Sequence, residues 1–226
     1  MAGGTGNASW LLDDMGCNVT MIDISPAMVR EFDARCQREG RSIDAECVDL
    51  VEYLDSSSSD DKFDVIVFSS ALHHFRYPDQ VVERSMGLLA PGGIIVTVAD
   101  PTRRVGARWF RACSLADRQT HLLLSDPAAL AGKLAKKLGL GRTSNGASAS
   151  NVGRVAEFHS ALGIDDVSLA ASIKALGGAV LMHRRYTAGY TWPFQQLYRL
   201  VSADTSFCML ISNRPSVDLS RIADDF

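Results

Sequence analysis

Short apolar runs alternate with amphipathic stretches through the first hundred residues. Strands buried in a parallel sheet are typically continuous β-branched or apolar runs, and four segments fit this pattern: Val19–Ile24, Ser42–Val48, Phe63–Phe68 and Ile94–Ala99. The segments between them carry apolar residues at helical spacing. One of these helices begins at Ser25–Pro26, a cap residue followed by proline at the first helical position. Strands alternating with helices predict an α/β fold with a doubly wound, mostly parallel sheet.

The alternation breaks after Asp100–Pro101. Residues 102–160 predict helices and loops, which we interpret as a helical cap inserted into a single domain of residues 1–226. Two more strands are predicted at Ala179–Tyr186 and Phe207–Ser212. Their connection is long and aromatic, so it either covers a binding pocket or packs a helix onto the sheet.

Composition narrows the class of protein without naming a function. The chain is 46% hydrophobic and 22% charged with a net charge of −3, which is ordinary for a globular domain. This charge argues against a general nucleic-acid or membrane surface. The five cysteines are scattered without metal-ligand spacing, which favours a reducing cytoplasm and predicts no metal site. We expect a cytoplasmic protein with a small-molecule partner; the oligomeric state is not predicted.

A glycine-rich turn opens the chain at Ala2-Gly3-Gly4-Thr5-Gly6 and runs directly into a helical pattern. Glycine lets a ligand approach the backbone, and the helix start directs unpaired N–H groups toward it. Asp23 ends the next strand, where a carboxylate can accept hydrogen bonds from ribose hydroxyls. The combination predicts a site for a nucleoside-containing cofactor. Alternatively, the glycines serve the geometry of the turn alone.

Polar residues also follow the later strands. Because the carboxyl ends of parallel strands meet at one edge of a sheet, we expect this edge to collect the candidate chemistry. The positions concerned are Gly4, Asp23, Asp49, Ser69 to His74, and Asp100.

Taken in order, the motifs resemble those of class I S-adenosylmethionine-dependent methyltransferases. The matching pieces are the glycine turn, Met21-Ile22-Asp23-Ile24-Ser25-Pro26-Ala27-Met28, Val48-Asp49-Leu50, Phe63-Asp64-Val65-Ile66-Val67 with Ala71-Leu72-His73-His74-Phe75, and Leu88-Leu89-Ala90-Pro91-Gly92-Gly93. Ala2 departs from the family's usual glycine. The resemblance implies a Rossmann-like sheet with an antiparallel last strand, S-adenosylmethionine as the cofactor, and methyl transfer to a small-molecule acceptor.

The resemblance also assigns roles to residues. Asp23 would hold the ribose hydroxyls, and Asp49 would accept from the adenine amino group unless it only caps a helix. If the acceptor must lose a proton, His74 is the first candidate base; packing or hydrogen bonding is the alternative for His73 and His74. The implied cofactor-binding set is Ala2, Gly3, Gly4, Gly6, Asp23, Ile24, Asp49, Leu50, Ser69 and Ser70.

Several alternatives stay open. Arg103, Arg104, Arg108, Arg111 and Arg118 favour an anionic acceptor, or they form a solvated helix face. A non-catalytic methyltransferase-like binding protein and an NAD(P)-dependent oxidoreductase are the competing functions.

A glycine turn of this kind normally follows a buried strand, and here only Met1 precedes it. We therefore expect an N-terminally truncated domain that lacks its first strand. In such a sheet the strands ending at Asp23 and Phe68 would have no partner between them.

Overall fold

The computed structural model describes residues 6–57, 62–103, 112–113, 115–117, 120–121, 124, 163–187, 191–200 and 204–213. Its helices are α1 (Asn7–Asp14), α2 (Pro26–Glu39), α3 (Leu50–Ser56), α4 (Pro78–Gly87), α7 (Asp166–Ala175) and α8 (Trp192–Leu200), with a 3-10 turn η1 (Leu72–His74). Its strands are β1 (Thr20–Asp23), β2 (Asp44–Cys47), β3 (Phe63–Ser69), β4 (Leu89–Pro101), β5 (Ala179–Tyr186) and β6 (Ser206–Ser212). Most of the predicted cap at 102–160 lies outside these residues.

The strands form two separate sheets rather than the predicted single sheet. One sheet is the parallel pair β1–β2, and the other has four strands in the order β3-β4-β6-β5. Strands β3 and β4 are parallel, whereas β6 runs antiparallel to both of its neighbours. The α/β class and the mixed sheet are confirmed, but β1 and β3 each have a single neighbour among the described strands. The sheet is divided because no described strand joins these two edges.

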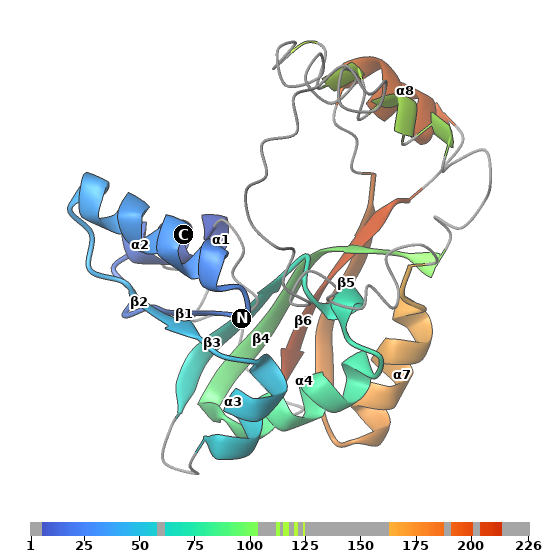
Figure 1. Cartoon of the computed structure of the whole chain (residues 1–226). Helices are drawn as coiled ribbons and strands as arrows, with labels where there is room; N and C mark the ends of the chain where they lie inside the picture. Colours follow the sequence, from blue (N-terminus) through green and yellow to red (C-terminus); the bar gives the residue numbers. More distant parts are fainter. Residues whose placement is uncertain are drawn as a thin grey trace.

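The four-stranded sheet carries the larger hydrophobic core. Helices α3, α4 and α7 pack together with it, as the blue-green to orange ribbons show (Figure 1). The core includes Ile66 and Phe68 of β3, Ile95 of β4, Val82 of α4 and Ile173 of α7. Along β4 the alternate residues Ile94, Val96 and Val98 are only half-buried. Helices α1 and α2 therefore do not cover the second face as a doubly wound sheet would require.

Helices α1 and α2 instead build a smaller unit on β1 and β2, with its own core (Figure 1). Phe32 of α2 and Met21 of β1 are nearly inaccessible, and Trp10 of α1 packs beside Phe32 with ring centroids 5.5 Å apart. The guanidinium of Arg41 reaches back to α1, with Nη1 2.6 Å from Asp13 Oδ2. Apolar burial and this ion pair hold the unit together.

Local sequence signals explain most helix ends. Ser25 caps α2, its hydroxyl accepting from the Met28 N–H at 3.4 Å, and Gly40 ends α2 with a φ of 66°. Asp165 caps α7 by accepting from the Ser168 N–H at 3.1 Å. The Pro91-Gly92-Gly93 motif lies within β4, where the pairing with β3 shifts register between Phe63 and Val65.

Two arginines that bind neighbouring aspartates at the start of α7 allow a matched test of burial. Arg185 binds the buried Asp166 with Nε–Oδ2 and Nη2–Oδ1 distances of 2.7 and 3.0 Å, whereas Arg103 binds the more exposed Asp165 at 3.1 Å. Arg185→Ala leaves a carboxylate in the interior with His183 alone, so we expect a loss of ~3–5 kcal/mol in unfolding free energy. Arg103→Ala should cost at most ~1 kcal/mol. Urea unfolding of both variants measures the difference, and equal losses would contradict it.

Two glycines allow a second matched test. Gly6 and Gly16 both have positive φ, at 76° and 80°, but only a Cβ on Gly6 would meet another group, the ring of Phe32. Gly16→Ala should cost ~1–2 kcal/mol for the left-handed backbone, and Gly6→Ala should lose ~1–3 kcal/mol more by overpacking. Thermal unfolding compares the two variants. Equal melting temperatures of the two variants would show that glycine is not required at position 6 by the contact with Phe32.

Candidate functional site

The carboxyl ends of β3 and β4 lie side by side and carry unusual backbone. Ser70 directly after β3 has a φ of 52°, and Ala99 near the end of β4 has a φ of 62°, both in the left-handed region. The Ser70 N–H donates to Val98 O at 2.7 Å, which ties the two strand ends together. Such conformations cost ~1–3 kcal/mol each and gather at functional sites.

The kink at Ala99 redirects the next residue. The ladder between β4 and β6 shifts register between Thr97 and Asp100, as in a β-bulge. Asp100 is completely buried, and its Oδ1 lies 2.9 Å from His73 Nδ1 and accepts the His73 backbone N–H at 3.1 Å. The other oxygen, Oδ2, has no hydrogen-bond partner among the described residues. The carboxylate therefore fixes the ring of His73.

The contact with Asp100 also determines which ring nitrogen of His73 can accept a hydrogen bond. A proton on Nδ1 is shared with the carboxylate, which leaves Nε2 as the acceptor. An imidazole held in this way by a buried carboxylate can take up a proton from a bound molecule.

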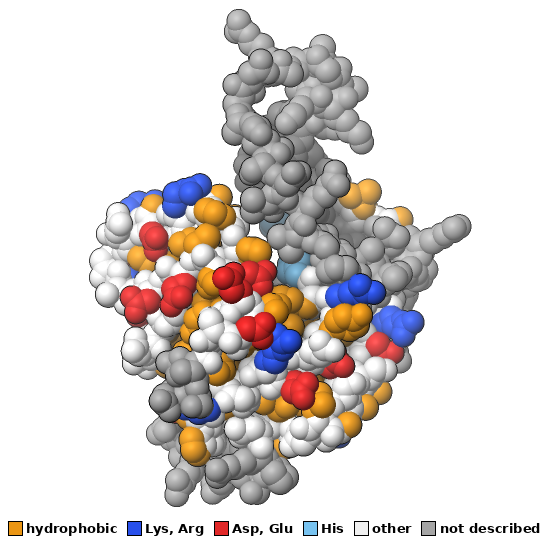
Figure 2. Space-filling model, turned by 60° about the horizontal axis from the view of Figure 1, so that its bottom comes forward, with side chains coloured by type: hydrophobic (Ala, Val, Ile, Leu, Met, Phe, Trp, Pro, Cys, Tyr) orange, Lys and Arg blue, Asp and Glu red, His pale blue; other side chains and the backbone are white. Residues whose placement is uncertain are grey.

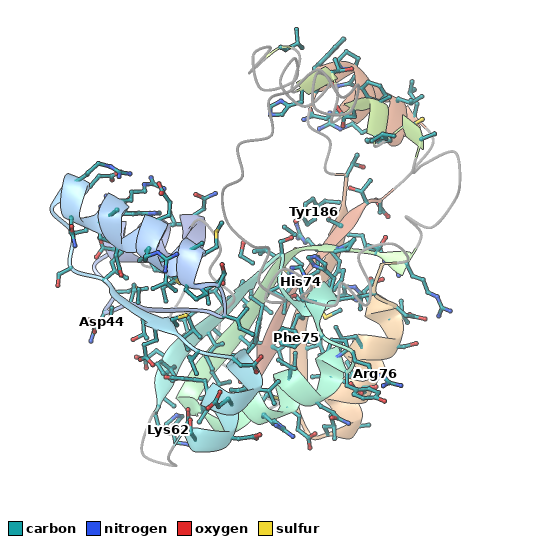
Figure 3. The ribbon with its side chains drawn as sticks, in the orientation of Figure 1. Asp44, Lys62, His74, Phe75, Arg76 and Tyr186 are labelled. Atoms are coloured by element: carbon teal, nitrogen blue, oxygen red, sulfur yellow. The ribbon has the colours of Figure 1, made fainter. Side chains whose placement is uncertain are left out.

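His74 and Tyr186 complete this edge of the four-stranded sheet, and Lys62 lies at the opposite end (Figure 3). The ring of His74 lies 4.1 Å from that of His73, centroid to centroid. The Tyr186 hydroxyl accepts from the Ala99 N–H at 2.9 Å. Burial raises the pKa of Tyr186, with smaller contributions from Cys208 and Asp100, so its hydroxyl keeps a proton to donate. In the space-filling view, histidine side chains lie between acidic and basic ones (Figure 2).

A second group of predicted residues lies at the carboxyl ends of β1 and β2. Asp23 is nearly buried, and its Oδ1 accepts from the Ser25 N–H at 2.8 Å. Asp49 caps α3, its Oδ1 accepting from the backbone N–H groups of Val51 and Glu52 at 2.7 and 3.3 Å. The Val48 N–H donates to Asp23 O at 3.2 Å, so the two aspartates end adjacent strands. Asp49 therefore does cap a helix, which was one of its two interpretations from the sequence.

The other predicted cofactor residues are more dispersed. Ile24 is exposed, whereas Leu50 is buried in the larger core. Gly6 caps α1 against Phe32, and Ser69 ends β3. Ala2, Gly3 and Gly4 lie outside the described residues.

The residues present fit a nucleoside cofactor by their chemistry. Each carboxylate offers about four acceptor positions, so Asp23 and Asp49 can serve the backbone and still accept from ribose hydroxyls or an amino group. The exposed side chain of Ile24 supplies apolar surface beside them. Within the part of the chain that the structure describes, no cluster of His, Cys, Asp and Glu could hold a metal ion.

The structure thus brings the predicted residues together as two groups: Asp23 with Asp49, and His73 with Asp100. Arg103 belongs to neither, because it pairs with Asp165 at the surface. Trp192 at the start of α8 is 71% exposed, and α8 stands apart from the sheets (Figure 1). The sequence analysis did not identify Tyr186 as a candidate. It could have been found as a tyrosine at the end of a predicted strand, the same kind of position that Asp23 and Asp100 occupy.

Comparison with known proteins bears on the fold. Residues 1–95 match a family described as "Methyltransferase domain". No curated protein matches the chain. No described helix is long and apolar enough to cross a membrane.

Solved structures of similar fold cover most of the chain. The (4+2) cyclase SpnF is 17% identical with a TM-score of 0.56, over 94% of this chain and 72% of its own. A SAM-dependent methyltransferase from Methanosarcina mazei is 14% identical with a TM-score of 0.56, over 95% and 90%. Magnesium protoporphyrin IX methyltransferase from Synechocystis PCC 6803, with bound SAH, is 12% identical with a TM-score of 0.52, over 93% and 70%. Residues 1–95 are therefore similar to methyltransferase domains, and the chain shares the fold of these solved structures.

Proposed function

We propose that the protein binds S-adenosylmethionine and transfers its methyl group to a small-molecule acceptor. The observation that carries the proposal is the pair Asp23 and Asp49, two carboxylates at the ends of neighbouring parallel strands in a methyltransferase fold. In this assignment Asp23 holds the ribose hydroxyls and Asp49 accepts from the adenine amino group. When bound, the cofactor supplies an electrophilic methyl group on a sulfonium.

Methyl transfer from a sulfonium depends mainly on alignment and exclusion of water. An acceptor hydroxyl gains further if its proton is removed as it reacts. His74 is the base that the sequence indicates. The 2.9 Å contact with Asp100 favours His73 instead, because the carboxylate orients its ring and stabilises the charge it would acquire. We therefore propose His73 as the base of an oxygen acceptor, with Tyr186 as a donor at the same edge.

An anionic acceptor would be received by arginines of the segment after β4. Arg103 is already paired with Asp165, so this part of the proposal rests on Arg104, Arg108, Arg111 and Arg118, which lie outside the described residues.

A fold alone does not determine chemistry, and one protein of similar fold is a cyclase. Isothermal titration with S-adenosylmethionine, S-adenosylhomocysteine and NADH separates the alternatives. Binding of both sulfur compounds without NADH, together with S-adenosylhomocysteine release over an acceptor panel, supports the proposal. Binding without any turnover favours a non-catalytic methyltransferase-like protein, and binding of NADH alone favours an oxidoreductase.

Asp23→Ala should weaken S-adenosylmethionine binding by ~1–3 kcal/mol, because charge-assisted hydrogen bonds to the ribose are lost. Asp44→Ala is the matched control, since Asp44 is an exposed aspartate at the opposite end of the neighbouring strand β2 (Figure 3). Calorimetric titration of both folded variants measures the effect. Equal affinity in the two variants would remove Asp23 from the site.

His73→Gln and Asp100→Asn should each lower kcat by ~10²–10⁴-fold with an oxygen acceptor, because the oriented base is lost. His74→Gln should retain most of the activity, because the Asp100 carboxylate contacts the ring of His73. The reverse pattern, with His74→Gln inactive and His73→Gln active, would support the assignment made from sequence.

A further inference from the structure

Strand β4 contains one extra residue near its carboxyl end, and this residue determines where Asp100 points. From Thr97 to Asp100 the ladder advances three residues along β4 but only two along β6. Thr97 is buried, and regular alternation would bury Ala99 next. Instead Ala99 is exposed and Asp100 is buried. The extra residue therefore turns Asp100 onto the face of the sheet where its carboxylate meets His73.

The peptide group between Val98 and Ala99 is held from both sides. Its carbonyl oxygen accepts the Ser70 N–H at 2.7 Å, and its N–H donates to the Tyr186 hydroxyl at 2.9 Å. Ala99 has a φ of 62°, a conformation that a bulge of this kind normally gives to glycine. Two hydrogen bonds therefore keep an alanine in a backbone conformation that its Cβ disfavours.

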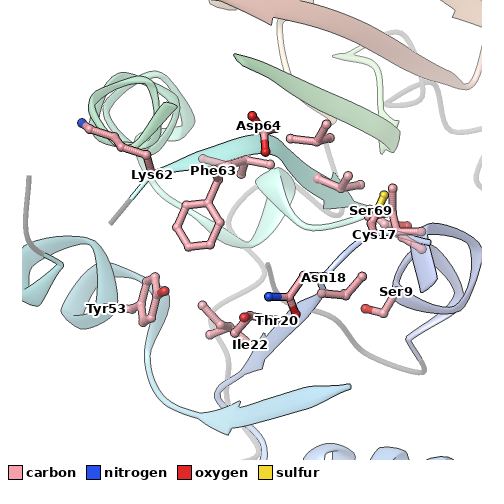
Figure 4. Close-up of a pocket in the computed structure, with 16 residues that line it drawn as sticks. Ser9, Cys17, Asn18, Thr20, Ile22, Tyr53, Lys62, Phe63, Asp64 and Ser69 are labelled. Atoms are coloured by element: carbon pink, nitrogen blue, oxygen red, sulfur yellow. The ribbon is translucent and has the colours of Figure 1, made fainter. Parts of the chain in front are cut away.

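One of these two anchors belongs to the end of β3. Ser69 precedes Ser70 and lines the groove between the two sheets, which has a volume of about 380 Å³ and is lined by α1, β1 and β3 (Figure 4). Both serines are in the cofactor-binding set that the sequence implies. The kink at Ala99 is therefore tied on one side to a strand end that borders this groove.

The other anchor, Tyr186, comes from β5, two strands away from β4 in the sheet (Figure 3). Tyr186 pairs with Ser206 of β6, and its carbonyl oxygen accepts the Thr205 N–H at 3.0 Å. Because β6 lies between β5 and β4, the side chain of Tyr186 reaches past β6 to meet the Ala99 N–H. Its backbone is fixed in the ladder, so its hydroxyl is a fixed acceptor for the kinked peptide.

We propose that Tyr186 is a positioning residue for His73. By accepting the Ala99 N–H, its hydroxyl holds the kink, and the kink holds Asp100 on the buried face. The Asp100 carboxylate then keeps the proton of the His73 ring on Nδ1 and leaves Nε2 free to accept. The consequence for methyl transfer rests on the proposed function, in which His73 is the base. The effect on the ring itself requires no bound molecule.

The test compares variants of the 226-residue chain by nuclear magnetic resonance of the imidazole nitrogens, with no cofactor or acceptor added. The His73 signals are identified by their loss in His73→Gln, and spectra are recorded at increasing pH until the ring is neutral. In the unsubstituted chain we expect a protonated Nδ1 and an unprotonated Nε2. Tyr186→Phe removes only the hydroxyl, so the proton should distribute over both nitrogens and their two shifts should move toward each other.

Substitutions at Ala99 show whether the hydroxyl acts through the kink. Glycine adopts a positive φ freely, so Ala99→Gly added to Tyr186→Phe should restore the spectrum of the unsubstituted chain. Ala99→Val should reproduce the effect of Tyr186→Phe with the hydroxyl intact, because β-branched residues disfavour a positive φ. It also serves as the test if Tyr186→Phe does not fold. Tyr77→Phe, at an exposed tyrosine, is the matched control and should leave the His73 shifts unchanged.

An unchanged His73 spectrum in Tyr186→Phe or in Ala99→Val would overturn the proposal, and would leave Tyr186 at most a donor to the acceptor. A changed spectrum that Ala99→Gly does not restore would also overturn it, because the hydroxyl would then act on the ring by another route. The proposed function is tested separately: it fails if the chain does not bind S-adenosylmethionine, whatever the spectra of His73 show.

Discussion

Backbone pairing is the constraint on which this structure depends. A strand satisfies its N–H and C=O groups only through neighbours on both sides or through water. Among the strands that the structure describes, β4 and β6 have two neighbours each, whereas β1 and β3 have one. The described strands form two sheets, and each sheet has its own hydrophobic core, one around β3 and β4 and the other around β1 and α2.

The carboxyl end of β4 shows how a local irregularity creates a chemical arrangement. A regular strand would direct successive side chains to alternate faces, with no special approach to a neighbouring turn. The left-handed Ala99 and the adjacent register shift instead bring Asp100 against His73 in η1. Tyr186 supports the irregular backbone by accepting the Ala99 N–H. Three separate elements therefore define the position of one imidazole ring.

Much of the fold was predictable because neighbouring residues in the chain determine it. Continuous apolar runs identified β1, β3 and the centre of β4, and the cap residue Ser25 identified the start of α2. The candidate site was predictable in part for a related reason, since parallel strands collect their carboxyl ends at one edge. Asp23 beside Asp49, and Asp100 beside His73, follow that rule.

The sequence by itself determined which segments form strands and helices and which polar residues stand at strand ends. These features depend on residue spacing, backbone preferences and caps, which act over a few neighbours. Only the tertiary structure decided that Asp100 holds His73 rather than His74, that Asp166 binds His183 and Arg185, and that β1 and β3 face a common groove. Each of these depends on contacts between distant segments and on a strand register or a single kink such as Ala99, which composition and periodicity do not encode.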